Sequence, residues 1–265
     1  MKHGLLIAGE VLSGTDWCQR DSRAWWDPES KARHSKWKGA EALDRYQLRP
    51  RADKIDVLVG HWTAGEAGTR SYADDGMRVV EVMKRRESRK RPGQRLRASA
   101  QFIIGACEPY TEFAPVWQTM DLANGWAATH VGRGPVNARS IGVEVVSAGL
   151  DGLANSRDRE EVAVFLLGRR NVLEFYPGQL RSWVRLANAL SGSCLPGGIE
   201  IPRSVPAEPV DEGTHQPLSR RFTKKELHRW SKAMEHYLMD NTNKVDAGTL
   251  LLQALLDDGW APRPL

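Results

Sequence analysis

The chain has 265 residues, of which 41% are hydrophobic, so it is long enough to bury a substantial core. No run approaches the ~20 apolar residues that cross a bilayer, and the apolar stretch after Met1 is too short for a signal peptide. We therefore expect a cytoplasmic protein without a transmembrane segment. The three cysteines are far apart and lack a CxxC spacing, so we interpret them as small buried hydrophobic residues.

The formal net charge is only +5, but cations are concentrated between residues 84 and 97. Eight Lys and Arg side chains accompany a single acidic residue, Glu87, in this basic segment. Such a run is commonly a solvated helix end and loop, or it attracts phosphate or an anionic cell envelope. No zinc finger, RNP-like strand or Arg/aromatic alternation accompanies it, so the alternative of a nucleic-acid-binding protein rests on this segment alone, and we expect no specific nucleic-acid partner.

The first 54 residues are Trp-rich and irregular, and we interpret them as an N-terminal extension packed on the core. Burial of its Trp side chains is favoured over stacking on sugar rings. Apolar runs then predict strands over residues 55–61, 99–105, 116–120 and 141–146. Apolar patterning predicts helices over residues 73–86, 160–175, 179–190 and 249–256, and a capping box at 223–226 predicts another helix start. Strands flanked by helices indicate an α/β or α+β domain with one central sheet.

Two segments carry candidate metal ligands. The strand over 55–61 ends at His61, and near the C-terminus His236 precedes Lys244 by eight residues and Asp246 by ten. Two His and one Asp are suitable ligands for one tetrahedral Zn²⁺ that keeps its fourth position for water. Such a metal lowers the pKa of bound water to about 7, which provides a nucleophile for an unreactive amide.

Two other candidates are open from local sequence alone. Glu144 lies within an apolar strand, where an unpaired carboxylate is expensive, so it is either an edge-strand residue facing solvent or a functional group. Lys244 is either a solvated surface group or a catalytic cation. His34, His215 and His228 have no partner at ligand spacing and are expected at the surface or at helix caps.

The order of several motifs resembles the type-2 N-acetylmuramoyl-L-alanine amidase superfamily, which includes phage endolysin amidases and the peptidoglycan recognition proteins. These motifs are His61-Trp62-Thr63-Ala64-Gly65, Ser99-Ala100-Gln101-Phe102, Ala128-Thr129-His130-Val131-Gly132, the Asn137–Glu144 segment NARSIGVE, and His236 with Lys244-Val245-Asp246-Ala247-Gly248. Gln101 and Phe102 stand where the family usually has His and Tyr, and Ala247 stands where it has Pro.

The resemblance implies an α/β fold in which a central mixed β-sheet is flanked by helices, as in a single amidase domain with an N-terminal extension. The extension would cover residues 1–54 and the catalytic domain 55–265, with an insertion around 150–178. By the same resemblance, one zinc ion per chain is bound by His61, His236 and Asp246. Glu144 is the general base and Lys244 stabilises the oxyanion. Substrate-binding residues would be His130, Trp62, Thr63 and Asn137.

The resemblance further implies a monomer that hydrolyses the MurNAc–L-Ala amide of peptidoglycan or of a muropeptide. We favour a phage or prophage endolysin that waits in the host cytoplasm until lysis, with the basic segment supplying electrostatic contact with an anionic envelope. A cytoplasmic muropeptide-recycling amidase and a non-catalytic peptidoglycan-binding protein of the same fold are the alternatives. The presence of all the expected ligand and catalytic residues favours an enzyme.

Overall fold

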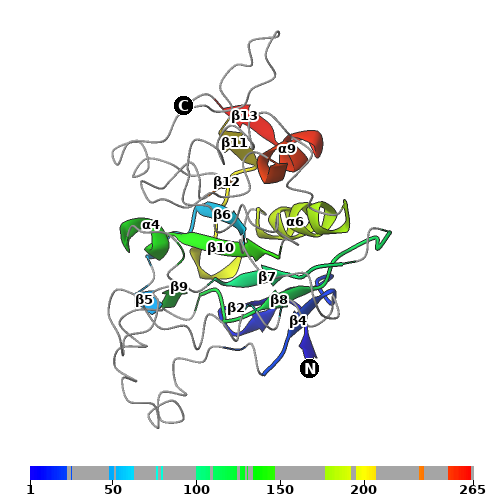
Figure 1. The fold of residues 1–265 in the computed structure, drawn as a ribbon. Coiled ribbons are helices and arrows are strands. Elements are labelled where there is room, and N and C mark those ends of the chain that lie inside the picture. Colours follow the sequence, from blue (N-terminus) through cyan, green and yellow to red (C-terminus); the bar gives the residue numbers. More distant parts are fainter. Residues whose placement is uncertain are drawn as a thin grey trace, which may run out of the picture.

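A seven-stranded mixed sheet forms the centre of the protein, in the order β1-β4-β8-β7-β10-β6-β12 (Figure 1). The structure is a computed structural model. It describes residues 1–22, 25, 48–50, 52–62, 76, 79, 100–107, 110–123, 126–128, 130, 134–146, 177–191, 195–206, 233–235 and 250–263. The strands of the sheet are β1 (Lys2–His3), β4 (Cys18–Arg20), β8 (Val116–Gln118), β7 (Phe102–Ile104), β10 (Ser140–Val145), β6 (Val57–Trp62) and β12 (Ala233–Glu235). The predicted central mixed sheet with helices is confirmed.

Smaller elements surround this sheet. Three two-stranded sheets pair β2 (Leu6–Ile7) with β3 (Glu10–Val11), β5 (Leu48–Pro50) with β9 (Trp126–Ala128), and β11 (Ser204–Pro206) with β13 (Ala261–Arg263). The described residues include the helices α4 (Gly134–Ala138), α6 (Pro177–Leu190), the 3-10 helix η2 (Pro196–Gly198) and α9 (Leu250–Asp257). Within the described ranges, no helix has the length and apolar character needed to cross a bilayer.

The four predicted strands are confirmed as β6, β7, β8 and β10, and two predicted helices are confirmed as α6 and α9. Of the helix predicted over 73–86, only Gly76 and Val79 are described, and both are helical. The helix predicted over 160–175 and the capping box at 223–226 lie outside the described residues.

β6 and β10 form the middle of the sheet and pair in parallel over six residues, from Val57 opposite Ser140 to Trp62 opposite Val145. Both strands are nearly continuous apolar runs, as expected where a parallel strand is covered on both faces. Because side chains alternate between faces, Ile141 and Val143 share one face of β10, whereas Ser140, Gly142 and Glu144 share the other. One strand therefore contributes both to the core and to a polar surface.

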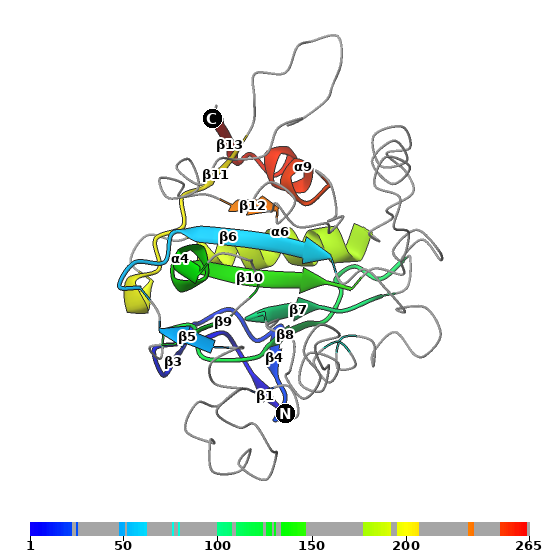
Figure 2. The same cartoon turned by 60° about the vertical axis from the view of Figure 1, so that its left-hand side comes forward.

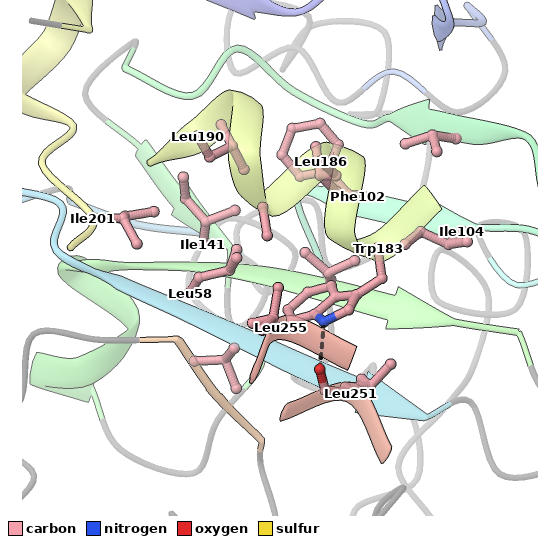
Figure 3. Packing of buried hydrophobic residues seen from close by; sticks show 14 of the residues in the cluster. Leu58, Phe102, Ile104, Ile141, Trp183, Leu186, Leu190, Ile201, Leu251 and Leu255 are labelled. Carbon is pink, nitrogen blue, oxygen red and sulfur yellow. Dashed lines mark hydrogen bonds between the residues drawn. The ribbon is translucent and has the colours of Figure 1, made fainter. Parts of the chain in front are cut away.

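The face that carries Ile141 and Val143 packs against α6 and α9 to form the main core (Figures 2 and 3). Trp183 of α6 is fully buried there, and its indole N–H donates to the Leu251 carbonyl of α9 at 2.9 Å. Gly60 of β6 allows this close approach, since a Cβ at that position would lie 2.5 Å from Leu251 Cδ1. Burying each large side chain contributes roughly 1.5–3 kcal/mol, so this face supplies much of the folding free energy.

The N-terminal residues form part of the central sheet, because β4 pairs in parallel with β8 and β1 pairs with β4. Gln118 accepts a hydrogen bond from the Leu6 amide at 2.8 Å and donates one to the Leu6 carbonyl at 2.7 Å. The Asp121 carboxylate accepts from the amides of Ala8 and Gly9, each at 2.7 Å. The division into a 1–54 extension and a 55–265 domain stays a prediction.

Trp17 and two cysteines are packed as the sequence predicts. Trp17 lies partly buried against the main core, with the Arg185 guanidinium 4.8 Å from its ring centroid. Cys18 and Cys107 are buried free thiols. Burial raises the pKa of Cys18 to about 12 and also raises the pKa of Cys107, so both favour the neutral thiol. Cys194 lies outside the described residues.

The Asp121 contacts predict that the N-terminal segment contributes to global stability. Asp121→Ala leaves the amides of Ala8, Gly9 and Ala123 without their carboxylate acceptor, and we expect a loss of about 1–3 kcal/mol in the free energy of unfolding. Urea denaturation measures this loss. Asp121→Asn is the control, because its remaining oxygen can serve part of the set and should lose less. An unchanged midpoint in Asp121→Ala would show that this segment is not coupled to the rest of the fold.

Candidate functional site

A polar site lies on the face of β6 and β10 opposite α6 and α9. Glu144 pairs in register with His61 on the neighbouring strand, so the two residues lie side by side on the same face of the sheet. β10 has β6 on one side and β7 on the other. The interpretation of Glu144 as an edge-strand residue is therefore wrong, and its side chain is half-buried.

The register of the two strands is fixed at their start by an ion pair. Arg139 Nε lies 2.6 Å from Asp56 Oδ1, and Arg139 Nη2 lies 2.7 Å from Asp56 Oδ2. The amide of Asp56 also donates to the Arg139 carbonyl at 3.1 Å. A bidentate pair of this kind combines charge with a fixed geometry, so it holds the two strand starts in one alignment.

His61 contacts a second histidine. Its side chain is 2% exposed, and its Nε2 lies 2.9 Å from Nδ1 of His130, which is 8% exposed. The two rings meet edge to face, with centroids 5.0 Å apart and an interplanar angle of 83°. Two neutral imidazoles can form this hydrogen bond when one ring donates its N–H and the other accepts.

Three residues fix the position of His130. Its Nε2 lies 2.9 Å from Ser140 Oγ, and its backbone amide donates to Asn137 Oδ1 at 2.9 Å. Its ring lies directly against Gly142, where a Cβ would come within 2.4 Å of His130 Cγ. The alternation of β10 thus places Ser140, Gly142 and Glu144 in a row, with the His130 ring over the first two.

Gln101, which stands where the resembling family has His, ties β7 to β10 beside this row. The side chain is fully buried. Its Oε1 accepts from the Gly142 amide at 2.7 Å, and its Nε2 donates to the Ser140 carbonyl at 3.3 Å. Phe102, in the place of the usual Tyr, is buried in the main core. The Gln101 side chain therefore holds the backbone of β10 at Ser140 and Gly142.

An apolar cluster borders Glu144 on the side away from His61. Ile103 of β7 pairs in register with Glu144 and belongs to a small buried cluster with Trp117 and Val146. Glu144 thus lies between His61 of β6 on one side and Ile103 of β7 on the other. A carboxylate in such surroundings is less hydrated than one in open water, which favours a role in proton transfer.

The remaining predicted site residues are not placed by the structure. Trp62 is described as the last backbone position of β6, while Thr63, His236, Lys244 and Asp246 lie outside the described residues. β12 ends at Glu235, which pairs with Gly60, the residue before His61. Among the described residues, no group of three or more His, Cys, Asp or Glu side chains could hold a metal.

Sequence reasoning did not single out Ser140, Gly142 or Gln101 as site residues. The signal for the first two was a period of two within NARSIGVE, which places two small residues and one acidic residue on the same face of an otherwise apolar strand. The bonds of Gln101 join different strands and have no comparable local signal.

Comparison with known proteins gives a family match and two similar structures. The model of the N-acetylmuramoyl-L-alanine amidase family (Amidase_2) matches residues 49–203, more than half of the chain. The N-acetylmuramyl-L-alanine amidase AmiD from E. coli, solved with anhydro-N-acetylmuramic acid-L-Ala-D-γ-Glu-L-Lys, is 18% identical over 53% of this chain and 44% of its own, with a TM-score of 0.33. AMPDH3 from Pseudomonas aeruginosa is 20% identical over 47% of each chain, with a TM-score of 0.25. The match thus spans less than half the length of either structure. No curated protein matches the chain.

The contact between Gly142 and His130 predicts that a larger side chain at position 142 displaces His130. In Gly142→Ala, the new methyl group collides with a rigid buried ring, so we expect displacement of His130 and a loss of about 1–3 kcal/mol in stability. Shifts of the His130 ring signals in NMR spectra and urea denaturation measure the two effects. Gly60→Ala is the control, because its methyl group meets the end of the Leu251 side chain on the opposite face. Unmoved His130 signals in Gly142→Ala would contradict the packing described above.

Proposed function

Because the chain belongs to the N-acetylmuramoyl-L-alanine amidase family, we propose that it is a zinc-dependent enzyme that hydrolyses the amide between MurNAc and L-Ala in peptidoglycan or a muropeptide. The observation that carries the proposal is the pairing of Glu144 with the buried His61, both within the matched residues 49–203. A histidine ligand and a carboxylate base side by side are what metal-assisted amide hydrolysis needs.

The residues fit a zinc site in their chemistry. His61 offers an imidazole on the polar face, and its Nε2 lies 2.9 Å from His130 Nδ1. The neighbouring parallel strand β12 ends directly before His236 in the sequence, and we propose His236 and Asp246 as the other two ligands. Two His and one carboxylate are a common ligand set for catalytic zinc, and when bound the ion supplies Lewis acidity for water and carbonyl alike.

We assign the proton transfers to Glu144. Its carboxylate accepts a proton as the water oxygen bonds to the carbonyl carbon, and the proton then goes to the amine nitrogen as the C–N bond breaks. The ammonium of Lys244 stabilises the negative charge that develops on the carbonyl oxygen. These steps leave a free amino group on the L-Ala residue of the released peptide and the lactyl carboxylate on the sugar.

The experiment that tests the proposal joins metal analysis with product detection. The wild-type chain should carry one zinc and release new L-alanine amino termini from purified peptidoglycan. His61→Ala and Asp246→Ala should lose both properties. His3→Ala is the control, since His3 lies on β1 at the far edge of the sheet and should keep both. Full zinc occupancy and turnover in His61→Ala would refute the assignment.

A separate prediction concerns the general base. Glu144→Gln keeps the shape of the side chain but cannot accept a proton from water at neutral pH, so turnover should fall on the order of 10²–10⁴-fold. Zinc content and the urea midpoint should stay close to the wild-type values. Steady-state release of L-alanine amino termini measures the loss. Unchanged turnover in a folded, zinc-loaded Glu144→Gln would assign Glu144 a structural role.

We further propose that the protein acts as a monomeric phage or prophage endolysin, supported by the eight cations of the basic segment, residues 84–97. Charges on a surface act mainly on association, and their reach at ~0.15 M salt is about 8 Å. Activity on intact sacculi separates this role from that of a recycling enzyme, which acts on small anhydro-muropeptides.

The basic segment leads to a prediction of its own. Replacing Arg89, Lys90, Arg91 and Arg95 by Gln should weaken binding to cells and its salt dependence, while cleavage of small soluble muropeptides stays nearly unchanged. Co-sedimentation with cells across a salt series and turnover of a soluble muropeptide measure the two effects. A proportional loss on the soluble substrate would instead place this segment at the catalytic cleft, and no change in either would indicate a solvated loop.

A further inference from the structure

We propose that His130 and Ser140 are positioning residues, which hold the His61 ring in the orientation and tautomer in which it binds the metal. This inference rests on the proposed function, because it concerns the metal ligand of the same site. It gives His130 a role other than contact with substrate.

The three side chains form one continuous hydrogen-bonded row. Ser140 Oγ lies 2.9 Å from His130 Nε2, and His130 Nδ1 lies 2.9 Å from His61 Nε2. Ser140 is fully buried, and both histidines are nearly so. Buried polar groups are costly unless they are hydrogen-bonded, so each link of this row needs one donor and one acceptor. The tautomer of one ring therefore determines the tautomer of the other.

Only one direction of the row suits a metal ligand at His61. If His61 Nε2–H donates to His130 Nδ1, then His130 Nε2–H donates to the Ser140 hydroxyl, and the lone pair of His61 is on Nδ1. In the reverse direction the proton of the His61 ring is on Nδ1. Metal-binding histidines generally donate their second ring N–H to a fixed acceptor, which sets tautomer and ring orientation. We infer that His130 is this acceptor for His61.

The surroundings of His130 favour a fixed ring. Asn137 holds the backbone amide of His130, and Gly142 leaves the space in which its ring lies. Gln101 in turn holds the backbone at Ser140 and Gly142. A ring held on its backbone, one edge and one face is a stable acceptor.

The first measurement is zinc affinity, determined by competition with a chromogenic chelator. His130→Phe keeps a ring over Gly142 but removes both ring nitrogens, and we expect zinc binding to weaken by about 10–100-fold. Ser140→Ala removes only the hydroxyl and should weaken it by a smaller factor in the same direction. Ser182→Ala is the matched control, because Ser182 is an equally buried, hydrogen-bonded serine on α6 and should leave zinc affinity unchanged.

The second measurement uses the metal-free protein. ¹⁵N NMR of the imidazole nitrogens, with the His61 signals identified by their loss in His61→Ala, should show the Nε2–H tautomer of His61 in the wild type. His130→Phe and Ser140→Ala should each shift His61 toward a mixture of tautomers, while Ser182→Ala should not. A merely structural role of His130 would lower the urea midpoint without moving these signals.

The outcomes separate this inference from the proposed function. If His130→Phe or Ser140→Ala folds, binds zinc as tightly as the wild type and keeps the His61 tautomer, the positioning role is overturned while the zinc site stands. If the wild-type chain binds no zinc, the proposed function fails and the metal-binding purpose of the row fails with it. The tautomer measurement then still decides whether the row orients His61. If His130→Phe does not fold, the zinc affinity and the His61 tautomer of Ser140→Ala test the positioning role by themselves.

Discussion

The parallel pairing of β6 with β10 is the interaction on which the candidate site depends. Six residue pairs fix its register, and the Arg139–Asp56 ion pair fixes its start. A shift of this register by one residue would turn Glu144 toward the face that packs on α6 and α9. Burial of its carboxylate among apolar side chains there would cost free energy. The register that buries the core is thus the same register that sets Glu144 beside His61. Site geometry here is a consequence of core packing.

Two glycines show how each strand serves both faces. Gly60 of β6 admits Leu251 on the helix face, and Gly142 of β10 admits His130 on the polar face. On the helix face, burial of apolar side chains stabilises the fold. On the polar face, hydrogen bonds only offset the cost of removing His61, His130 and Ser140 from water. The polar face therefore relies on the stability that the helix face provides.

The sequence predicted those elements whose patterns are local. β6 and β10 are continuous apolar runs, and α6 shows apolar residues at helical spacing, so each could be predicted without its partners. β1 and β3 are two-residue strands with exposed side chains and show no such pattern. Hydrogen bonds with residues more than a hundred positions away, such as the two between Gln118 and Leu6, hold this N-terminal segment on the sheet. Motif order predicted His61 and Glu144 individually, whereas the contact of His130 with Ser140 depends on how the chain returns to β10.

The departure at Gln101 has a physical reason that motif comparison alone cannot supply. A primary amide carries its donor and its acceptor on one carbon, so it can bond a backbone N–H and a backbone C=O of a single neighbouring strand. Gln101 does so at Gly142 and Ser140, the two residues against which the His130 ring rests. An imidazole also carries its two nitrogens on one carbon, but its N–H and its lone pair point away from each other in the ring plane, so it cannot bridge these two groups in the same way. The residue that departs from the family pattern therefore fixes the backbone that positions His130, and through His130 it bears on His61.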